Sequence, residues 1–229
     1  MEESVHDQIT FGTDDFAENP EQRCPVVLIL DVSGSMGGRP IQELNRGLVT
    51  LKDELVADEI AAKRVEIATV TFGPVQVAHD FVGASVYVPP TLTTTGDTPM
   101  GGAILQGLEL LRQRKDVYRA NGIAFYRPWV FLLTDGAPTD SIDQAAAMIR
   151  EGEASKAFSF FAVGIGGAKM DVLAQLSPAR PALKMDGLRF RDLFVWLSSS
   201  LGAISQSAPD TTVPLANPTA GGGWASVGS

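Results

Sequence analysis

The sequence predicts an α/β fold: a three-layer, doubly wound, Rossmann-like arrangement whose central sheet is mostly parallel, with one antiparallel edge strand. Short runs rich in Val, Ile and Phe indicate strands that are covered on both faces. Stretches with helical periodicity separate these runs, and right-handed crossovers between successive strands then give a parallel sheet. The edge strand is expected in a hairpin at 76–82. The expected buried strands are residues 26–30, 65–72, 129–133 and 158–165.

Apolar residues at steps of three and four predict the helices. Pro40 begins the first one, because a first helical position does not need the N–H that proline lacks. A third helix is expected at "SIDQ", where Ser141 and Gln144 have the spacing of a capping box. The apolar positions of the first, second and last helices are Ile41, Leu44, Leu48, Leu51 and Leu55, then Ile104, Leu108 and Leu111, then Leu193, Leu197, Leu201 and Ile204.

The length of 229 residues suits one substantial domain with flanking segments. We expect an N-terminal extension at 1–24, the domain at 25–206 and a tail at 207–229. The tail is rich in Pro, Gly, Ser and Thr and has no periodicity. It is either disordered or a strap lying on the domain, with Trp224 as its only large anchor.

Charge and cysteine content narrow the classes of partner. A net charge of −9 argues against nucleic acid or an anionic membrane as the main partner, since both would repel the chain. The single cysteine, Cys24, excludes an intramolecular disulfide framework and suits a reducing compartment. No segment approaches the roughly 20 apolar residues that span a bilayer. We therefore expect a cytoplasmic protein.

Two predicted strands end on an aspartate, Asp31 in "LILDVSGSM" and Asp135 in "FLLTDGAPTD". The carboxyl ends of parallel strands meet at one edge of a sheet, where ligands of α/β folds bind. Ser33 and Ser35 alternate with Asp31, so their side chains can point the same way. With a threonine from "TTTGDTPMGGA" these groups form an all-oxygen set, which favours Mg²⁺, Mn²⁺ or Ca²⁺ over zinc.

Three motifs in this order, "DVSGSM", "GDTPMGGAI" and "LLTDGAPTD", resemble the von Willebrand factor A (VWA) domain family and its metal-ion-dependent adhesion site. The resemblance covers roughly residues 25–204. It implies a metal, Mg²⁺ above all, and one coordination position left for a carboxylate of a partner protein. It places Thr98 in the set, although Thr94 or Thr95 could compete. The ligands that it implies are Asp31, Ser33, Ser35, Thr98 and Asp135.

The segments "PVVLILDVSGSM", "RPIQELNRGL" and "FLLTDGAPTD" are similar in sequence to the bacterial TerY-like branch of this family. That branch is associated with tellurium-resistance and stress gene clusters. The resemblance implies that the protein acts together with a kinase and a PP2C-type phosphatase.

Other roles compete for the same residues. Asp31 and the serines could cap a helix, and Asp135 alone could be a turn residue. Asp97 is expected to be a solvated loop charge and Asp140 to help start a helix. The basic run at 111–119 is expected to be a solvated helix face, or else a docking site for an acidic partner.

A binding module without turnover of its own is the function that these motifs favour. The alternative is a Mg²⁺-dependent phosphoester hydrolase or phosphotransferase with Asp31 or Ser33 as nucleophile. The motifs contain no Lys or Arg apart from Arg39 to clamp a phosphate, and no general base. A nucleotide-binding domain is disfavoured, because "GIGG" at 164–167 lacks the full glycine fingerprint.

Overall fold

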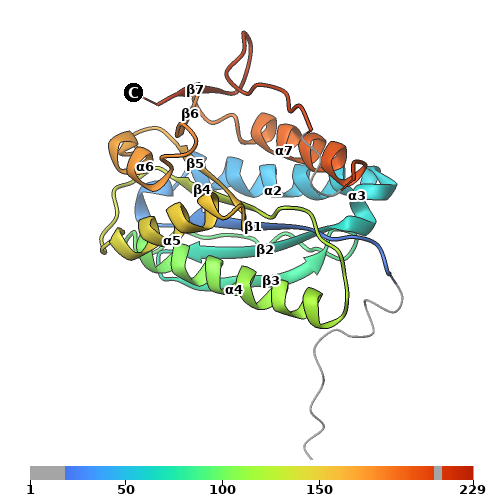
Figure 1. The fold of residues 1–229 in the computed structure, drawn as a ribbon. Coiled ribbons are helices and arrows are strands. Elements are labelled where there is room, and N and C mark those ends of the chain that lie inside the picture. The colour runs from blue at the N-terminus through green and yellow to red at the C-terminus, as the bar shows by residue number, and fades with distance from the viewer. Residues whose placement is uncertain (1–18, 209–212, 229) are drawn as a thin grey trace, which may run out of the picture.

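A seven-stranded sheet forms the middle layer of the structure, a computed structural model that describes residues 19–208 and 213–228. The strand order is β3-β2-β1-β4-β5-β6-β7. Helices cover both faces, with α2 and α7 on one side and α4 and α5 on the other (Figure 1). The strands are β1 (Cys24–Asp31), β2 (Val65–Phe72), β3 (Gln76–Gly83), β4 (Trp129–Thr134), β5 (Ser159–Gly164), β6 (Leu183–Met185) and β7 (Ala225–Val227).

The helices follow the strands in the alternation that the sequence predicts. They are η1 (Gly34–Met36), α2 (Arg39–Ala57), α3 (Glu59–Arg64), α4 (Met100–Ala120), α5 (Asp143–Ala154), α6 (Met170–Leu176) and α7 (Phe190–Ser205). Within the described residues, no helix is both long and apolar enough to cross a bilayer.

The doubly wound, mostly parallel sheet is confirmed. Strands β2, β1, β4, β5 and β6 are parallel to one another. The expected antiparallel edge strand is β3, which pairs with β2. A second antiparallel strand, β7, closes the opposite edge beside β6. It lies beyond residue 206, so the sheet continues into the segment that the sequence set apart as a tail.

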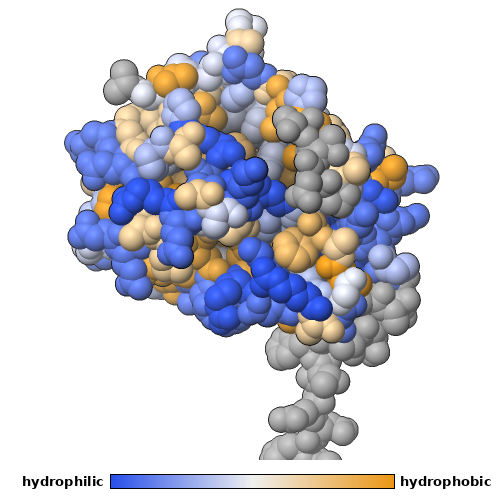
Figure 2. Space-filling model, viewed as in Figure 1, coloured by the Kyte–Doolittle hydropathy of each residue, from blue (hydrophilic) through white to orange (hydrophobic). Residues whose placement is uncertain are grey.

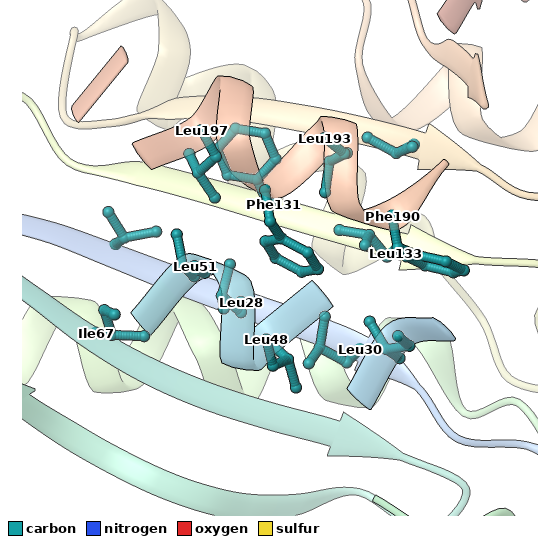
Figure 3. Packing of buried hydrophobic residues seen from close by; sticks show 14 of the residues in the cluster. Leu28, Leu30, Leu48, Leu51, Ile67, Phe131, Leu133, Phe190, Leu193 and Leu197 are labelled. Atoms are coloured by element: carbon teal, nitrogen blue, oxygen red, sulfur yellow. The ribbon is translucent and has the colours of Figure 1, made fainter. Parts of the chain in front are cut away.

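The two faces of each central strand enter different cores, as expected for strands covered on both sides. Leu28 and Leu30 of β1 pack with Leu48 of α2 and Leu193 of α7, as Figure 3 shows. Val27 and Ile29 belong to the core beneath α4 and α5. Each fully buried Val, Leu or Ile contributes about 1.5–3 kcal/mol through removal of its side chain from water, so both cores stabilise the sheet.

Helices α2 and α7 pack in close contact on the upper face, and a glycine permits this approach. A Cβ atom added to Gly47 would lie 2.5 Å from Cδ2 and 2.9 Å from Cε2 of Phe194. Both residues are buried. The small size of Gly47 is therefore a packing requirement, although glycine lowers the propensity of a helix to form.

The described part of the tail agrees with the strap interpretation. Trp224 is 3% exposed and lies 5.7 Å, ring centre to ring centre, from Trp196 of α7. The Trp196 Nε1–H donates to the carbonyl oxygen of Ala216 at 2.7 Å. Residues 216–227 are thus attached to α7 and β6.

The start of α5 differs from the prediction. The helix begins at Asp143, and Ser141 Oγ accepts a hydrogen bond from the Asp143 N–H at 3.3 Å. The N-cap residue is Ile142, whose side chain makes no capping hydrogen bond. The predicted capping box of Ser141 and Gln144 is therefore wrong. Three short elements, α3, α6 and β6, were not predicted, because segments of three to seven residues are too short to show a periodicity.

The basic run forms an exposed face of α4, as predicted. Arg112 forms ion pairs with Glu109 and Asp116 on its own helix, and Arg119 pairs with Asp116. Figure 2 shows hydrophilic residues gathered over this helix. Arg114 instead turns inward to the buried carboxylate of Glu66. These partners make the run a solvated, self-paired helix face.

Replacement of Gly47 by alanine tests the contact between α2 and α7. Gly47→Ala is expected to lower the free energy of unfolding by about 1–3 kcal/mol, because the added methyl group overpacks against Phe194. Denaturant unfolding measures this change. Asp53→Ala, on the exposed side of the same helix, is the control and should shift stability by less than about 0.5 kcal/mol. A stabilised Gly47→Ala variant would contradict the close packing.

Cys24 tests the burial of β1. Burial raises the pKa of its thiol to about 12, and the side chain is 2% exposed. At pH 8 only about one thiol in ten thousand is ionised, so a disulfide reagent such as DTNB should label the folded chain very slowly. Labelling should become rapid in concentrated guanidinium chloride. Equal rates in both conditions would show that the start of β1 is accessible.

Candidate metal centre

The carboxyl ends of β1 and β4 bring Asp31 and Asp135 to the same edge of the sheet. Leu30 of β1 pairs with Leu133 of β4, so the residues that follow them, Asp31 and Thr134, are neighbours. The Thr134 hydroxyl donates a hydrogen bond to Asp31 Oδ2 at 2.5 Å, and both side chains are fully buried. The parallel register therefore fixes the position of the Asp31 carboxylate.

The loop after β1 returns two serines to this carboxylate. The Ser33 N–H donates to Asp31 Oδ1 at 2.8 Å, and the hydroxyl oxygens of Ser33 and Ser35 lie 3.0 Å apart. The Ser35 hydroxyl donates to Asp135 Oδ1 at 2.6 Å. Four of the five predicted ligands thus form one connected network that joins β1 to β4.

Thr98 reaches the site from a separate loop. That loop lies against the β1 loop, because the Thr95 N–H donates to Val32 O at 2.8 Å and the Gly34 N–H to Gly96 O at 3.2 Å. A Cβ atom added to Gly136 would be 3.4 Å from Thr98 Oγ1 and 3.9 Å from Asp31 Oδ2. The Thr98 hydroxyl and the Asp31 carboxylate therefore both lie within 4 Å of the same point beside Gly136.

The Thr98 hydroxyl is the group that the surrounding protein leaves unused. The residue is 7% exposed, yet its hydroxyl makes no hydrogen bond within residues 19–208 and 213–228, whereas its carbonyl oxygen accepts from Met100 and Thr139. The Thr98 hydroxyl is not among the fully buried unpartnered side-chain atoms of the described residues, so its oxygen is open to solvent and available to a ligand.

The competing threonines lie elsewhere in the loop. Thr94 Oγ1 would be 3.8 Å from a Cβ atom on Gly37, which places it beside the β1 loop. Thr95 is exposed and contributes its backbone to the contact with Val32. The geometry favours Thr98.

The electrostatics of the site favour a cation. Burial raises the pKa of Asp135, the hydrogen bond from Ser35 lowers it, and the nearby Asp31 carboxylate raises it again. A carboxylate that is both partly desolvated and close to a second one gains most from a positive charge between them. In the part of the chain that the structure describes, no three His, Cys, Asp or Glu side chains gather to hold a metal, so hydroxyls must complete a set here.

The chemistry of this donor set fits a divalent cation. Two carboxylates and three hydroxyls supply hard oxygen atoms, which Mg²⁺ and Mn²⁺ prefer, and they approach from three loops. Asp97 is exposed on its loop. Asp140 accepts hydrogen bonds from the N–H groups of Gly101 and Gly102 at 2.9 and 2.8 Å, and so caps α4.

Sequence reasoning missed Thr134. Its hydroxyl orients Asp31, but as the last residue of an apolar strand it carries no motif of its own. Its place immediately before Asp135, across from Asp31 in a parallel pair, was the signal that could have revealed it.

Comparisons with known proteins agree with this fold. Residues 26–190 match the sequence model of a family described as von Willebrand factor type A domain. No protein with curated annotation matches the chain.

Solved structures share the fold at low sequence identity. The pilus adhesin SpaC of Lactobacillus rhamnosus GG is 14% identical with a TM-score of 0.63, over 80% of this chain and 30% of its own. Proximal thread matrix protein 1 of the mussel byssus is 16% identical with a TM-score of 0.54, over 79% of this chain and 48% of its own. Manganese-loaded TRAP protein of Plasmodium vivax is 17% identical with a TM-score of 0.52, over 76% and 74%. This chain thus spans less than half the length of the first two.

The match covers most of the chain and includes every strand from β1 to β6, together with the loops that carry the oxygen donors. The chain belongs to the von Willebrand factor type A domain family.

Proposed function

We propose that this chain is a metal-dependent protein-interaction module that binds an acidic group of a partner protein through a divalent cation. Domains of this family generally mediate metal-dependent protein interactions or adhesion, and commonly bind a divalent metal. Asp31, Ser33, Ser35, Thr98 and Asp135 would hold the cation, Mg²⁺ above all. A carboxylate of the partner would take the remaining coordination position.

The unpartnered hydroxyl of Thr98 is the observation that carries the proposal. Every other donor of the set already takes part in a hydrogen bond: Asp31, Ser33, Ser35 and Asp135 form the network described above. The Thr98 hydroxyl lies near Asp31 beside Gly136 and has no hydrogen-bond partner in the described residues. A cation between them would use this hydroxyl and offset the repulsion of the two carboxylates.

The proposal also includes a specific cellular role. The similarity of "PVVLILDVSGSM" and "FLLTDGAPTD" to the TerY-like branch supports a bacterial tellurite or stress response in the cytoplasm, with a kinase and a PP2C-type phosphatase as partners. A pull-down from the native host with and without chelator would test the partners. Loss of both proteins on chelation would support them, and their absence from both samples would contradict this role.

The proposal gives the chain no turnover of its own. Arg39, the cation next to the serine loop, is exposed and lies 4.0 Å from Glu43 of its own helix. His79 lies in β3 against the ring of Tyr87, whereas His6 is outside the described residues. A phosphotransferase would need a cationic clamp and a general base at the site, and neither side chain is placed for these roles.

Thr98→Val tests the metal site directly. The substitution keeps the shape of the side chain and removes only the hydroxyl, so the metal-free protein should retain its melting temperature. Calorimetry with Mg²⁺ and Mn²⁺ should show affinity at least about tenfold weaker than that of the unaltered chain, equivalent to about 1.4 kcal/mol. Asp31→Ala and Ser33→Ala should abolish the binding heats.

Thr95→Val is the matched control for Thr98→Val. It removes a hydroxyl from the same loop, on an exposed side chain, and should leave metal affinity unchanged. Equal affinities of both variants and the unaltered chain would exclude Thr98 from the site. Heats that persist in Asp31→Ala and Ser33→Ala would overturn the whole donor set.

A generic aryl phosphate tests the enzymatic alternative. We expect no metal-stimulated release of phosphate by the purified chain, because Arg39 is not placed as a phosphate clamp and His79 is not placed as a general base. Turnover that requires Mg²⁺ and disappears in Asp31→Asn would establish a phosphoester hydrolase instead. The rate of phosphate release in a reaction without protein gives the baseline.

A further inference from the structure

The surface around the candidate metal centre is poor in side chains. Exposed glycines follow strands β1 and β5, and another precedes Thr98. They are Gly34, Gly37, Gly38, Gly96, Gly166 and Gly167. Two physical reasons explain most of them, and two glycines remain for which neither reason holds.

Backbone conformation explains three of these glycines. Gly38, Gly96 and Gly166 have φ angles of 81°, 68° and 54°, a region that other residues rarely adopt. Packing explains Gly37, since a Cβ atom there would lie 3.1 Å from Gly34 O.

Gly34 and Gly167 are required neither by conformation nor by packing. Neither has a positive φ angle. The nearest heavy atom to an added Cβ would be Gly96 O for Gly34 and Asp135 O for Gly167, both at 3.9 Å, which is ordinary van der Waals contact. Both residues are exposed, so a side chain would extend into solvent. Within the chain itself, a larger residue could occupy either position.

These two positions lie on opposite sides of the donor set. Gly34 follows β1 and lies between Ser33 and Ser35, whereas Gly167 follows β5. Strand β4, which ends before Asp135, lies between β1 and β5 in the sheet. Asp31, Ser33 and Thr98 are buried beneath this surface, and Ser35 is exposed at its level. Gly34 thus adjoins the two serines, and Gly167 lies beside the backbone of Asp135, so the two glycines border the donor set at the ends of β1 and β5.

We propose that Gly34 and Gly167 form a side-chain-free contact surface on which the main chain of an acidic partner segment lies while its carboxylate enters the metal site. This inference rests on the proposed function and specifies the partner. The Thr98 hydroxyl lies beside Gly136, has no hydrogen-bond partner in the described residues and is open to solvent, so it is available to a ligand that approaches this edge. Asp and Glu have short side chains, so their carboxylates reach a shallow site only when the backbone comes close.

Charge complementarity supports an acidic segment as the occupant. Arg39 follows the Gly37–Gly38 pair, and Lys169 follows Gly167 by two residues. Both are exposed. Arg39 lies 4.0 Å from Glu43 of its own helix, so Lys169, which forms no ion pair within the described residues, is the cation that favours an additional acidic residue beside the one that binds metal.

The experiment compares two carboxylates of different size on the full chain loaded with Mn²⁺. Acetate carries a carboxylate without a backbone, and poly-L-glutamate carries carboxylates on one. Calorimetry measures Mn²⁺ and poly-L-glutamate binding, and water-proton relaxation of the bound Mn²⁺ reports displacement of water by acetate. The variants are Gly34→Val and Gly167→Val.

We expect both variants to bind Mn²⁺ and acetate within about twofold of the unaltered chain and to bind poly-L-glutamate at least about tenfold more weakly. The matched control is Gly83→Val. Gly83 lies at the opposite end of the sheet, has no positive φ angle, and would place its Cβ 3.8 Å from Ser85 Oγ. It should bind all three probes normally.

Each other outcome overturns a defined statement. If both glycine variants bind poly-L-glutamate as the unaltered chain does, the proposed contact surface is wrong. It is also wrong if the unaltered chain binds Mn²⁺ but does not bind poly-L-glutamate. Neither result contradicts the metal site. Loss of acetate displacement along with poly-L-glutamate would show that the substitutions block the metal itself, and would also overturn it. An unaltered chain that does not bind Mn²⁺ would overturn the proposed function.

Discussion

The parallel register of β1 and β4 is the constraint on which the candidate site depends. It sets Asp31 beside Thr134 and brings Asp135 to the same edge. A shift of one residue in this pairing would turn the side chains of β1 to the opposite faces and exchange its two cores. Because Leu28 and Ile29 are fully buried on opposite faces, the register is strongly specified by packing. The same burial that stabilises the sheet therefore positions the carboxylates.

The loop that carries Thr98 depends on a second constraint, the close approach of two backbones. A Cβ atom on Gly96 would lie 1.9 Å from Gly73 O, and one on Gly73 would lie 2.5 Å from Thr95 O. Both glycines have positive φ angles. Only residues without side chains can stack these loops over the end of β1, and this stacking lets a loop from a distant part of the chain deliver a hydroxyl to Asp31.

The layers could be predicted because they follow from strong local patterns, and the same patterns predict that Asp31 and Asp135 meet at one edge of the sheet. Buried strands are continuous apolar runs, and Asp31 and Asp135 stand where two of these runs stop. Thr134 could not be predicted in the same way, since its role depends on which strand lies beside it. The edge strand β7 depends on pairing with β6, a three-residue strand without periodicity, so it arises from tertiary contact and not from local preference.

The hydrogen bonds of the site are compatible with cation binding without rearrangement. Thr134 and the Ser33 N–H donate to the two oxygens of Asp31, and Ser35 donates to Asp135. The Thr134 and Ser35 hydroxyls give their protons to carboxylates, and the Ser33 hydroxyl therefore donates to Ser35. Each serine oxygen keeps at least one lone pair, through which it can coordinate a cation. A donor set that had to break its own hydrogen bonds would lose about 1 kcal/mol for each one. Here the network holds the carboxylates in place, and the lone pairs of Ser33, Ser35 and Thr98 remain available for an ion, so the geometry that folds the loops also prepares them for a ligand.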